Sequence, residues 1–384
     1  MDDVTRLLSD LVSIPSVNPM GRMVAPSQSG ESRLTAFLES WMHARGIPSR
    51  RQPVSPGRDN LLARFDSPAG TRRRVLLFDA HQDTVPTDGM TIDPFTPRIE
   101  GRRLYGRGSC DVKGSLAAML WALQRLHRER PTAAASVILA CTVDEEFTHT
   151  GSSALAAFPH QAGLAVVAEP TSLELVACHK GAIRWRIRTR GVACHSSTPE
   201  RGINAIYRMA RVVETLEQYA NELAASPPDP ILGPPTLSVG RIEGGQSVNI
   251  VPDWCEIEID RRVIPGEHPQ SCLEEVGRRL AGRFAGAEWI EMGAPWVNMP
   301  ALSARLELWE EPLKEAVRSV TGRTPQVLGV PFGTDAGPLG ASGLPCVVLG
   351  PGDIAQAHTR DEWIDLDQVD QAAEIYFQIA LRLG

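Results

Sequence analysis

VLLFDAHQD, at residues 75–83, joins a continuous apolar run to a histidine and an aspartate at its end. Similar apolar runs occur at 137–141, 164–168 and 346–349. Runs that do not alternate with polar residues are typical of strands covered on both faces, as in the sheet of an α/β layer. We therefore expect an α/β fold with a mixed, mostly parallel sheet flanked by helices.

Apolar residues recur with helical spacing between and beyond these runs. Such segments lie at 116–126, at 2–13 and at about 366–382, and we expect helices there. In open α/β sheets, ligands gather at the carboxyl ends of the strands. Side chains that directly follow the apolar runs are therefore the first candidates for a functional site.

Five side chains that can bind metal close separate strand-like segments. They are His81, Asp111, Glu146, Glu169 and His358. Two imidazoles and three carboxylates offer nitrogen and hard oxygen ligands, which suit zinc, cobalt or manganese. A carboxylate such as Asp111 can bridge two cations about 3.5–4 Å apart. Five ligands are therefore enough for two divalent ions, of which zinc is the first expectation.

Two further acidic residues are not needed as ligands. Asp83 lies two residues after His81, so on extended backbone both side chains point the same way and Asp83 can orient the imidazole. Glu145 adjoins Glu146, and adjacent side chains diverge on extended backbone. One glutamate can then bind metal while Glu145 acts as general base on a water molecule. This arrangement indicates hydrolysis.

Eight motifs in order resemble the co-catalytic zinc amidohydrolase family of acetylornithine deacetylase, succinyl-diaminopimelate desuccinylase and glutamate carboxypeptidase. The resemblance covers nearly the whole chain. The motifs are SIPSVNP at 13–19, HQDTVP at 81–86, GRGSCDVKG at 106–114, DEE at 144–146, AEPT at 168–171, HSSTPERGINA at 195–205, GTDAG at 333–337 and AHTRDEW at 357–363.

The resemblance implies a role for each residue of the centre. One metal ion would be held by His81, Asp111 and Glu169, and the other by Asp111, Glu146 and His358. Glu145 would be the general base, with Asp83 behind His81. The sequence departs from the family at none of these positions.

The middle of the chain has a different pattern. Apolar residues alternate with arginines at 182–192 and with acids at 255–263, which is typical of half-solvated strands. If these strands are neighbours, arginines face acids. A helix is expected at about 203–224. We expect residues 180–293 to form a smaller α+β domain inserted into the first, because metal candidates lie on both sides of it; the resemblance implies that it is a lid and dimerisation domain.

The domain organisation follows from this insertion. Residues 1–179 and 294–384 would form the two parts of a zinc-peptidase-like catalytic domain. The resemblance implies that the lid closes over the site and pairs two subunits. We accordingly expect a homodimer.

Further residues are candidates by resemblance, with structural alternatives for several of them. His195 would stabilise an oxyanion, sometimes from the partner subunit, although a lone histidine is usually structural. Asn249 and Arg262 resemble positions that bind the substrate carboxylate, but an ordinary ion pair is an equal explanation for Arg262. Gly333, Thr334 and Asp335 would line the substrate pocket, with a simple turn as the alternative.

Several classes of function are disfavoured. Gly106 and Gly108 lack the third glycine of a dinucleotide fingerprint, and Asp111 would repel a pyrophosphate. The formal charge of −7 argues against nucleic-acid and anionic-membrane partners. No segment reaches the roughly 18 apolar residues of a membrane span, and the N-terminus does not have the pattern of a secretion signal. We expect a cytoplasmic protein with reduced cysteines; Cys110, beside Asp111, is expected to pack rather than to bind metal.

The predicted function is hydrolysis of the amide of an N-acyl-L-amino acid, as in acetylornithine deacetylase, because GTDAG and AHTRDEW look most like that branch. A dipeptidase or carboxypeptidase with the same centre is the alternative enzyme. A non-catalytic metal-binding homologue is the alternative of a different class, and it should lack the base or a ligand. His149, close after DEEF, has no assigned role.

Overall fold

The structure is a computed structural model that describes residues 3–70, 74–303 and 306–384. The chain divides into two compact units. Unit 1 comprises Met1–Ala177, Ser303–Leu328 and Thr334–Gly384, and unit 2 comprises Cys178–Leu302 and Gly329–Gly333. The insertion expected at 180–293 falls within unit 2.

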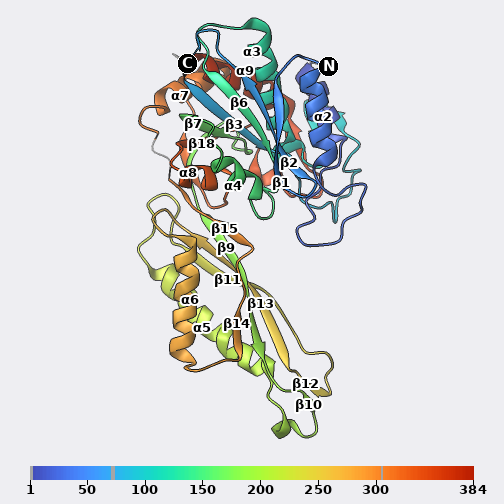
Figure 1. Cartoon of the computed structure of the whole chain (residues 1–384), viewed down its shortest axis with the longest axis vertical. Helices are drawn as coiled ribbons and strands as arrows, with labels where there is room; N and C mark the ends of the chain where they lie inside the picture. The colour runs from blue at the N-terminus through green and yellow to red at the C-terminus, as the bar shows by residue number, and fades with distance from the viewer. Residues whose placement is uncertain (1–2, 71–73, 304–305) are drawn as a thin grey trace. The chain divides into compact units, whose positions relative to one another are not determined.

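A nine-stranded mixed sheet forms the frame of unit 1 (Figure 1). Its order is β1 (Ser49–Ser55), β2 (Arg58–Phe65), β6 (Ser136–Thr142), β3 (Val75–His81), β7 (Leu164–Val167), β18 (Cys346–Val348), β8 (Leu175–His179) and β16 (Leu302–Ser303), with β17 (Val327–Val330) on β8. The central strands β6, β3, β7 and β18 are parallel to one another, whereas β2 pairs antiparallel with β6. The prediction of a mixed, mostly parallel sheet is confirmed.

The four apolar runs became these central strands because both faces of the sheet are covered. Every residue of β6 is buried, and so is all of β3 after its first residue. The helices of unit 1 are α1 (Asp3–Val12), α2 (Ser32–His43), α3 (Gly114–Glu129), α4 (Thr150–Ala156), α7 (Glu310–Thr321), α8 (Ala336–Ala341) and α9 (Leu366–Arg382). Among them, α3, α7 and α1 pack on α9, and α4 packs on α8. A small sheet of β19 (Trp363–Asp365), β5 (Arg103–Tyr105) and β4 (Arg98–Glu100) completes the unit.

Unit 2 is built on an antiparallel sheet. Its strands are β11 (Thr236–Gly244), β13 (Trp254–Val263), β9 (Gly181–Arg190) and β14 (Ile290–Met292), in that order, with β15 (Val297–Met299) also on β9. The helices α5 (Ala205–Ala225) and α6 (Pro269–Arg283) pack on this sheet over a core that contains Trp185 and Ile257. The short strands β10 (Cys194–His195) and β12 (Ile250–Val251) form a separate pair.

The two alternating strands are neighbours, and in that arrangement their arginines face acids as expected. In the register of β9 and β13, Arg184, Arg186 and Arg188 lie opposite Asp260, Glu258 and Glu256. An ion pair joins each arginine to the acid that faces it, with N–O distances of 2.7, 2.9 and 2.9 Å in that order. Opposite charges on facing positions favour this register over a slipped one.

The seven cysteines are unbridged, and all lie in described parts of the chain. Cys110 is buried, its thiol donates to the carbonyl oxygen of Asp353 at 3.5 Å, and burial raises its pKa well above the ordinary value. Cys110 belongs to the hydrophobic core of unit 1. Among the helices that the structure describes, none is long and apolar enough to cross a bilayer.

Candidate metal centre

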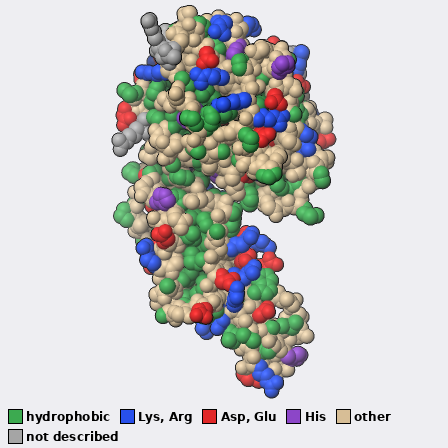
Figure 2. Space-filling model, in the orientation of Figure 1, with side chains coloured by type: hydrophobic (Ala, Val, Ile, Leu, Met, Phe, Trp, Pro, Cys, Tyr) green, Lys and Arg blue, Asp and Glu red, His purple; other side chains and the backbone are tan. Residues whose placement is uncertain are grey.

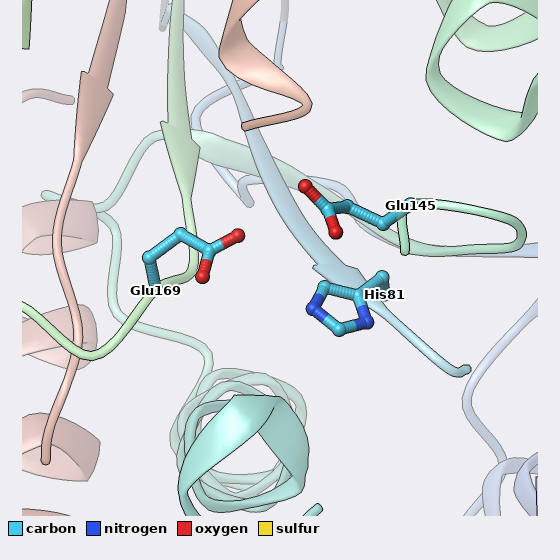
Figure 3. Close-up of side chains that lie close together, drawn as sticks. All are labelled: His81, Glu145 and Glu169. Carbon is cyan, nitrogen blue, oxygen red and sulfur yellow. The ribbon is translucent and has the colours of Figure 1, made fainter. Parts of the chain in front are cut away.

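The carboxyl ends of three neighbouring strands bring the first candidate residues together. His81 is the last residue of β3. Glu145 and Glu146 lie in the turn after β6, and Glu169 lies two residues after β7. Because β3 is parallel to both β6 and β7, these ends meet at one edge of the sheet. His81, Glu145 and Glu169 are buried and face a common space (Figure 3), with ligand atoms within 4.8 Å of one another.

Asp111 lies in a turn that a buried glutamate holds in place. The turn, at Ser109–Lys113, precedes α3, and its backbone is not helical at Asp111. The Glu362 carboxylate pairs with Arg107 at 2.7 Å, with both side chains buried. It also accepts hydrogen bonds, at 2.9, 2.9 and 3.0 Å, from the backbone N–H groups of Gly108, Cys110 and Asp111. Glu362 therefore fixes the backbone that carries Asp111.

The two carboxylate oxygens of Asp111 face different histidines. Oδ1 is 3.1 Å from His81 Nε2, and Oδ2 is 3.1 Å from His358 Nε2. His358 Nε2 is also 3.1 Å from Glu146 Oε2. Glu146 Oε1 is buried and has no hydrogen-bond partner among the described residues. One carboxylate between two imidazoles is the arrangement that bridges two cations, and an orphaned buried oxygen is available as a further ligand atom.

Burial and neighbouring acids oppose ionisation of the glutamates in this centre. Burial, followed by the charge of Glu169, raises the pKa of Glu145 well above its ordinary value. Burial and the charge of Asp111 raise the pKa of Glu169 well above its ordinary value. The same two causes raise the pKa of Glu146 to about 7. Burial also acts to raise the pKa of Asp111, but hydrogen bonds from two imidazoles outweigh it and lower that pKa. The cluster carries more negative charge than the protein around it stabilises.

The two imidazoles of the centre are shifted toward their protonated, positively charged form, which compensates the charge of the acids. Burial acts to lower the pKa of His81, but the hydrogen bond to Asp111 and the nearby acids raise it well above its ordinary value. Hydrogen bonds to Asp111 and Glu146 raise the pKa of His358 to about 11. Ligands bind metal as neutral imidazoles and ionised carboxylates. Divalent cations would thus replace these protons as the counter-charge, and the residues present fit two such ions.

Asp83 supports the turn that carries the two glutamates. Its Oδ1 accepts the N–H of Glu145 at 3.1 Å, and its Oδ2 accepts the N–H of Glu146 at 3.2 Å. Asn18 donates to the same carboxylate at 2.8 Å. The closest partner of His81 Nδ1 is the Asp83 backbone carbonyl, at 2.9 Å, while Asp83 Oδ1 is 3.7 Å away. The contact with the imidazole thus runs mainly through the Asp83 main chain.

A second cluster of polar side chains lies next to Glu145, close to the start of α8 (Ala336–Ala341). His149 Nδ1 lies 3.1 Å from Asp335 Oδ1, and Thr142 Oγ1 lies 3.0 Å from Asp335 Oδ2. The same hydroxyl is 2.9 Å from Asp79 Oδ1. Burial, followed by the charge of Asp335, raises the pKa of Asp79 well above its ordinary value. The sequence offered no sign of this connection, because its members come from three separate segments of the chain.

His195 and Asn249 lie in unit 2, on adjacent segments. His195 pairs with Ile250 across β10 and β12, and the N–H of Ser196 donates to the carbonyl oxygen of Asn249 at 3.0 Å. The imidazole is exposed, and its Nδ1 is 2.7 Å from Ser197 Oγ. The structure thus brings these two candidates together within unit 2. Their roles in catalysis stay predictions.

The remaining candidates have ordinary structural partners. Arg262 forms an ion pair with Asp260, two residues away on its own strand, at 2.8 Å. Gly333 leaves no room for a side chain, since a Cβ there would lie 1.8 Å from Met299 Cε. Thr334, in unit 1, is buried in the turn before α8, where its Oγ1 accepts the N–H of Ala336 at 3.1 Å. The pocket roles of all three stay predictions.

Comparison with known proteins agrees with the resemblance seen in the motifs. Residues 77–382 match the model of "Peptidase family M20/M25/M40". The chain is 33% identical over 387 residues to an acetylornithine deacetylase from Photorhabdus laumondii, covering 97% of this chain and 95% of that protein. An acetylornithine deacetylase from Proteus mirabilis is 31% identical with the same coverage.

Solved structures share the fold at lower identity. An M20 family metallo-carboxypeptidase from Sulfolobus solfataricus superposes with a TM-score of 0.81 and 19% identity, covering the whole of both chains. YxeP from Bacillus subtilis, a dinuclear metal-binding peptidase of the M20 family, gives a TM-score of 0.68 and 16% identity, covering 98% of this chain and 96% of that one. The predicted family resemblance is confirmed.

Proposed function

The chain belongs to peptidase family M20/M25/M40 and is a hydrolytic enzyme, and from this premise we propose that it cleaves the amide bond of an N-acyl-L-amino acid. The observation that carries the proposal is the Asp111 carboxylate between His81 and His358, with Glu145 close to His81. This geometry supports Asp111 as a bridging ligand and Glu145 as an acidic group that need not bind metal, since both are buried.

We assign the ligands of two divalent ions as the motifs suggest. One ion would be held by His81, Asp111 and Glu169, and the other by Asp111, Glu146 and His358. Zinc, cobalt and manganese all suit these nitrogen and oxygen donors, with zinc first. When bound, such ions supply Lewis acidity and lower the pKa of a coordinated water.

The protein's own residues would move the proton and hold the substrate. Glu145 takes the proton from the attacking water and returns it to the leaving amine. Burial raises the pKa of Glu145, which favours its taking up a proton from the water. His195 would donate a hydrogen bond to the oxyanion of the tetrahedral intermediate. Asn249, Arg262, Gly333 and Thr334 would bind the substrate carboxylate and line its pocket, and closure of the lid would exclude water.

An acyl-amino-acid substrate is favoured over a peptide by the sequence relatives. Proteins 31–33% identical over nearly the whole chain are acetylornithine deacetylases, whereas the peptidases among the solved structures are 14–21% identical and share the fold. A dipeptidase or carboxypeptidase remains the second candidate. A non-catalytic homologue is disfavoured, because the base and all five ligands are present.

We also propose a cytoplasmic homodimer formed through unit 2. Several large apolar side chains are exposed there, including Tyr207 on α5, Ile242 on the edge strand β11 and Val248. Figure 2 shows apolar side chains open to solvent on this unit. Exposed apolar patches mark association surfaces. A monomer with full activity in sedimentation at the assay concentration would refute the dimer.

Substrate hydrolysis by metal-restored protein tests the function directly. Chelator-stripped protein should regain turnover with zinc, cobalt or manganese on a panel of N-acetyl and N-succinyl amino acids and dipeptides. Glu145→Gln should lower kcat by about 10²–10⁴-fold, the usual contribution of a general base, and retain both metal ions. Glu288→Gln, at an exposed glutamate of unit 2, is the matched control and should keep full activity. Metal binding without turnover on any substrate would refute the proposal.

A further inference from the structure

A buried histidine–aspartate pair lies beside the Glu145 carboxylate. His149 Nδ1 is 3.1 Å from Asp335 Oδ1 and 3.7 Å from Glu145 Oε1. The exposed fractions of His149, Asp335 and Glu145 are 8%, 1% and 9%. None of the roles assigned to the metal centre uses His149 or Asp335. Buried ionisable groups in contact with a reacting group are candidates for a part in the reaction.

We propose that His149 is a positioning residue, anchored by Asp335, that holds the Glu145 carboxylate on the side of the metal centre. This inference rests on the proposed function, in which Glu145 is the general base. It adds a specific support for that base, which comes from the turn after β6 together with the start of α8.

Asp335 is itself fixed at both carboxylate oxygens. Oδ1 is engaged by His149 Nδ1, and Oδ2 lies 3.0 Å from the hydroxyl of Thr142, the last residue of β6. Because β6 is a fully buried central strand, Thr142 has little freedom to move. The position of the imidazole is therefore set by the sheet, through two hydrogen bonds.

The backbone of His149 also holds the ring in place. Its φ is +55°, a left-handed conformation that is uncommon for residues other than glycine. Its N–H donates to the carbonyl oxygen of Asp144 at 2.7 Å, and its carbonyl accepts the hydroxyl of Ser152 at 3.3 Å. Such a conformation persists where the surroundings determine it, and it is often found at functional sites. Here it directs the imidazole toward Asp335 and Glu145.

Glu145 needs such a support because acids lie on more than one side of it. The charges of Glu169 and Asp335 both act on its carboxyl group, so repulsion alone does not define where the carboxylate rests. A general base must stay within hydrogen-bond reach of the proton it takes, and a misplacement of about 1 Å can cost about 10²-fold in rate. His149 fills the side of the Glu145 carboxylate that faces Asp335. The side that faces the metal ligands stays open to the carboxylate.

Two replacements of similar size separate positioning from packing. The side-chain nitrogen of Asn stands near the place of His Nδ1, so His149→Asn keeps a donor for Asp335, whereas His149→Leu removes it. His149→Leu should lower kcat by about 10–100-fold, the range for residues that orient catalytic groups, with KM and bound metal unchanged. His149→Asn should restore most of that loss. His127→Leu is the control, since His127 in unit 1 has its own hydrogen bond to the Arg64 carbonyl at 3.0 Å.

A combination with Glu145→Gln shows whether the effect passes through the base. His149→Leu should lower kcat no further in the Glu145→Gln background, because no base remains to be positioned. Equal losses for Asn and Leu, a further loss in that background, or loss of a bound metal ion would each overturn the proposal. The last result would instead make His149 a ligand, since the ligand atoms of His149, Asp335 and Glu145 lie within 4.8 Å of one another.

Thermal unfolding gives a measure that is independent of turnover. It compares the unaltered protein, His149→Leu, Glu145→Gln and the variant that carries both substitutions. The Tm shifts of His149→Leu and Glu145→Gln should be non-additive if the two side chains interact. If the unaltered protein hydrolyses no substrate, the proposed function fails, and this coupling still decides the inference. Non-additive shifts would support the contact with Glu145, and additive shifts would overturn it.

Discussion

The charged side chains of unit 1 and those of unit 2 are stabilised in different ways. In the metal centre of unit 1, Asp83 and Glu362 are almost fully buried and each accepts at least two backbone N–H groups. On the sheet of unit 2, Arg186 and Arg188 are about half exposed and pair with acids on the facing strand. The first arrangement replaces water with fixed hydrogen bonds, and the second leaves water in place.

This difference predicts where the molecule depends on single residues. A buried charge that loses its partner leaves the other charge uncompensated in a medium of low polarity. A surface ion pair contributes little, because solvent screens it and side-chain entropy opposes it. Removing one charged partner should therefore lower stability strongly in the centre of unit 1. The same change should lower it only slightly in the ion pairs between β9 and β13 of unit 2, which we call the ladder.

The largest effect is expected for Glu362→Ala. It removes the partner of buried Arg107 and the acceptor of three N–H groups in the turn that carries Asp111. The free energy of unfolding should fall by about 3–5 kcal/mol, and metal affinity should fall with it. Denaturant unfolding and metal analysis measure the two quantities. Glu256→Ala on the unit 2 ladder is the paired substitution, and equal losses in both variants would remove the distinction between the regions.

Metal removal should come next in size and should act on one unit. A ligand at 100 times its Kd stabilises the state that binds it by about 2.7 kcal/mol. Hydrogen exchange should therefore quicken on chelation at residues 108–112 and 144–149, where Asp111, Glu145 and Glu146 lie. Residues 182–190 and 254–263 of unit 2 should exchange as before. A uniform change across both units would mean that the metal ions stabilise the whole chain and not the centre alone.

The sequence predicted the elements whose patterns are local. The four apolar runs are central strands, and the helix expected at 366–382 is α9, Leu366–Arg382. The helix expected at 203–224 begins at Ala205, because the Asn204 side chain caps it by accepting the N–H of Tyr207. Three ligand candidates, His81, Glu146 and Glu169, meet because β3, β6 and β7 are parallel, so that their carboxyl ends share one edge. Asp111 and His358 do not close strands of this sheet and reach the same site from the turn before α3 and the loop before β19.

Of the residues that support the centre, Asp83 was predicted but Glu362 and the pair of His149 and Asp335 were not, and the reason is physical. Glu362 acts on a turn 251 residues earlier in the chain, and Asp335 pairs with His149 across 186 residues. A carboxylate that accepts backbone N–H groups has no spacing rule, since every residue except proline offers such a group. The sequence displays the side chains that would bind metal, but the fold determines which side chains hold them.

The smallest effect is expected for a cross-strand pair of unit 2. Arg188 and Glu256 lie opposite each other on β9 and β13, 2.9 Å apart, with side chains 49% and 22% exposed. A double-mutant cycle of Arg188→Ala and Glu256→Ala should give a coupling of about 0.2–1 kcal/mol. That coupling should shrink at about 1 M salt, where the Debye length is about 3 Å. A larger, salt-independent coupling would mean that this pair, like Arg107 and Glu362, is shielded from water, and the contrast between the two units would then rest on the centre's backbone hydrogen bonds alone.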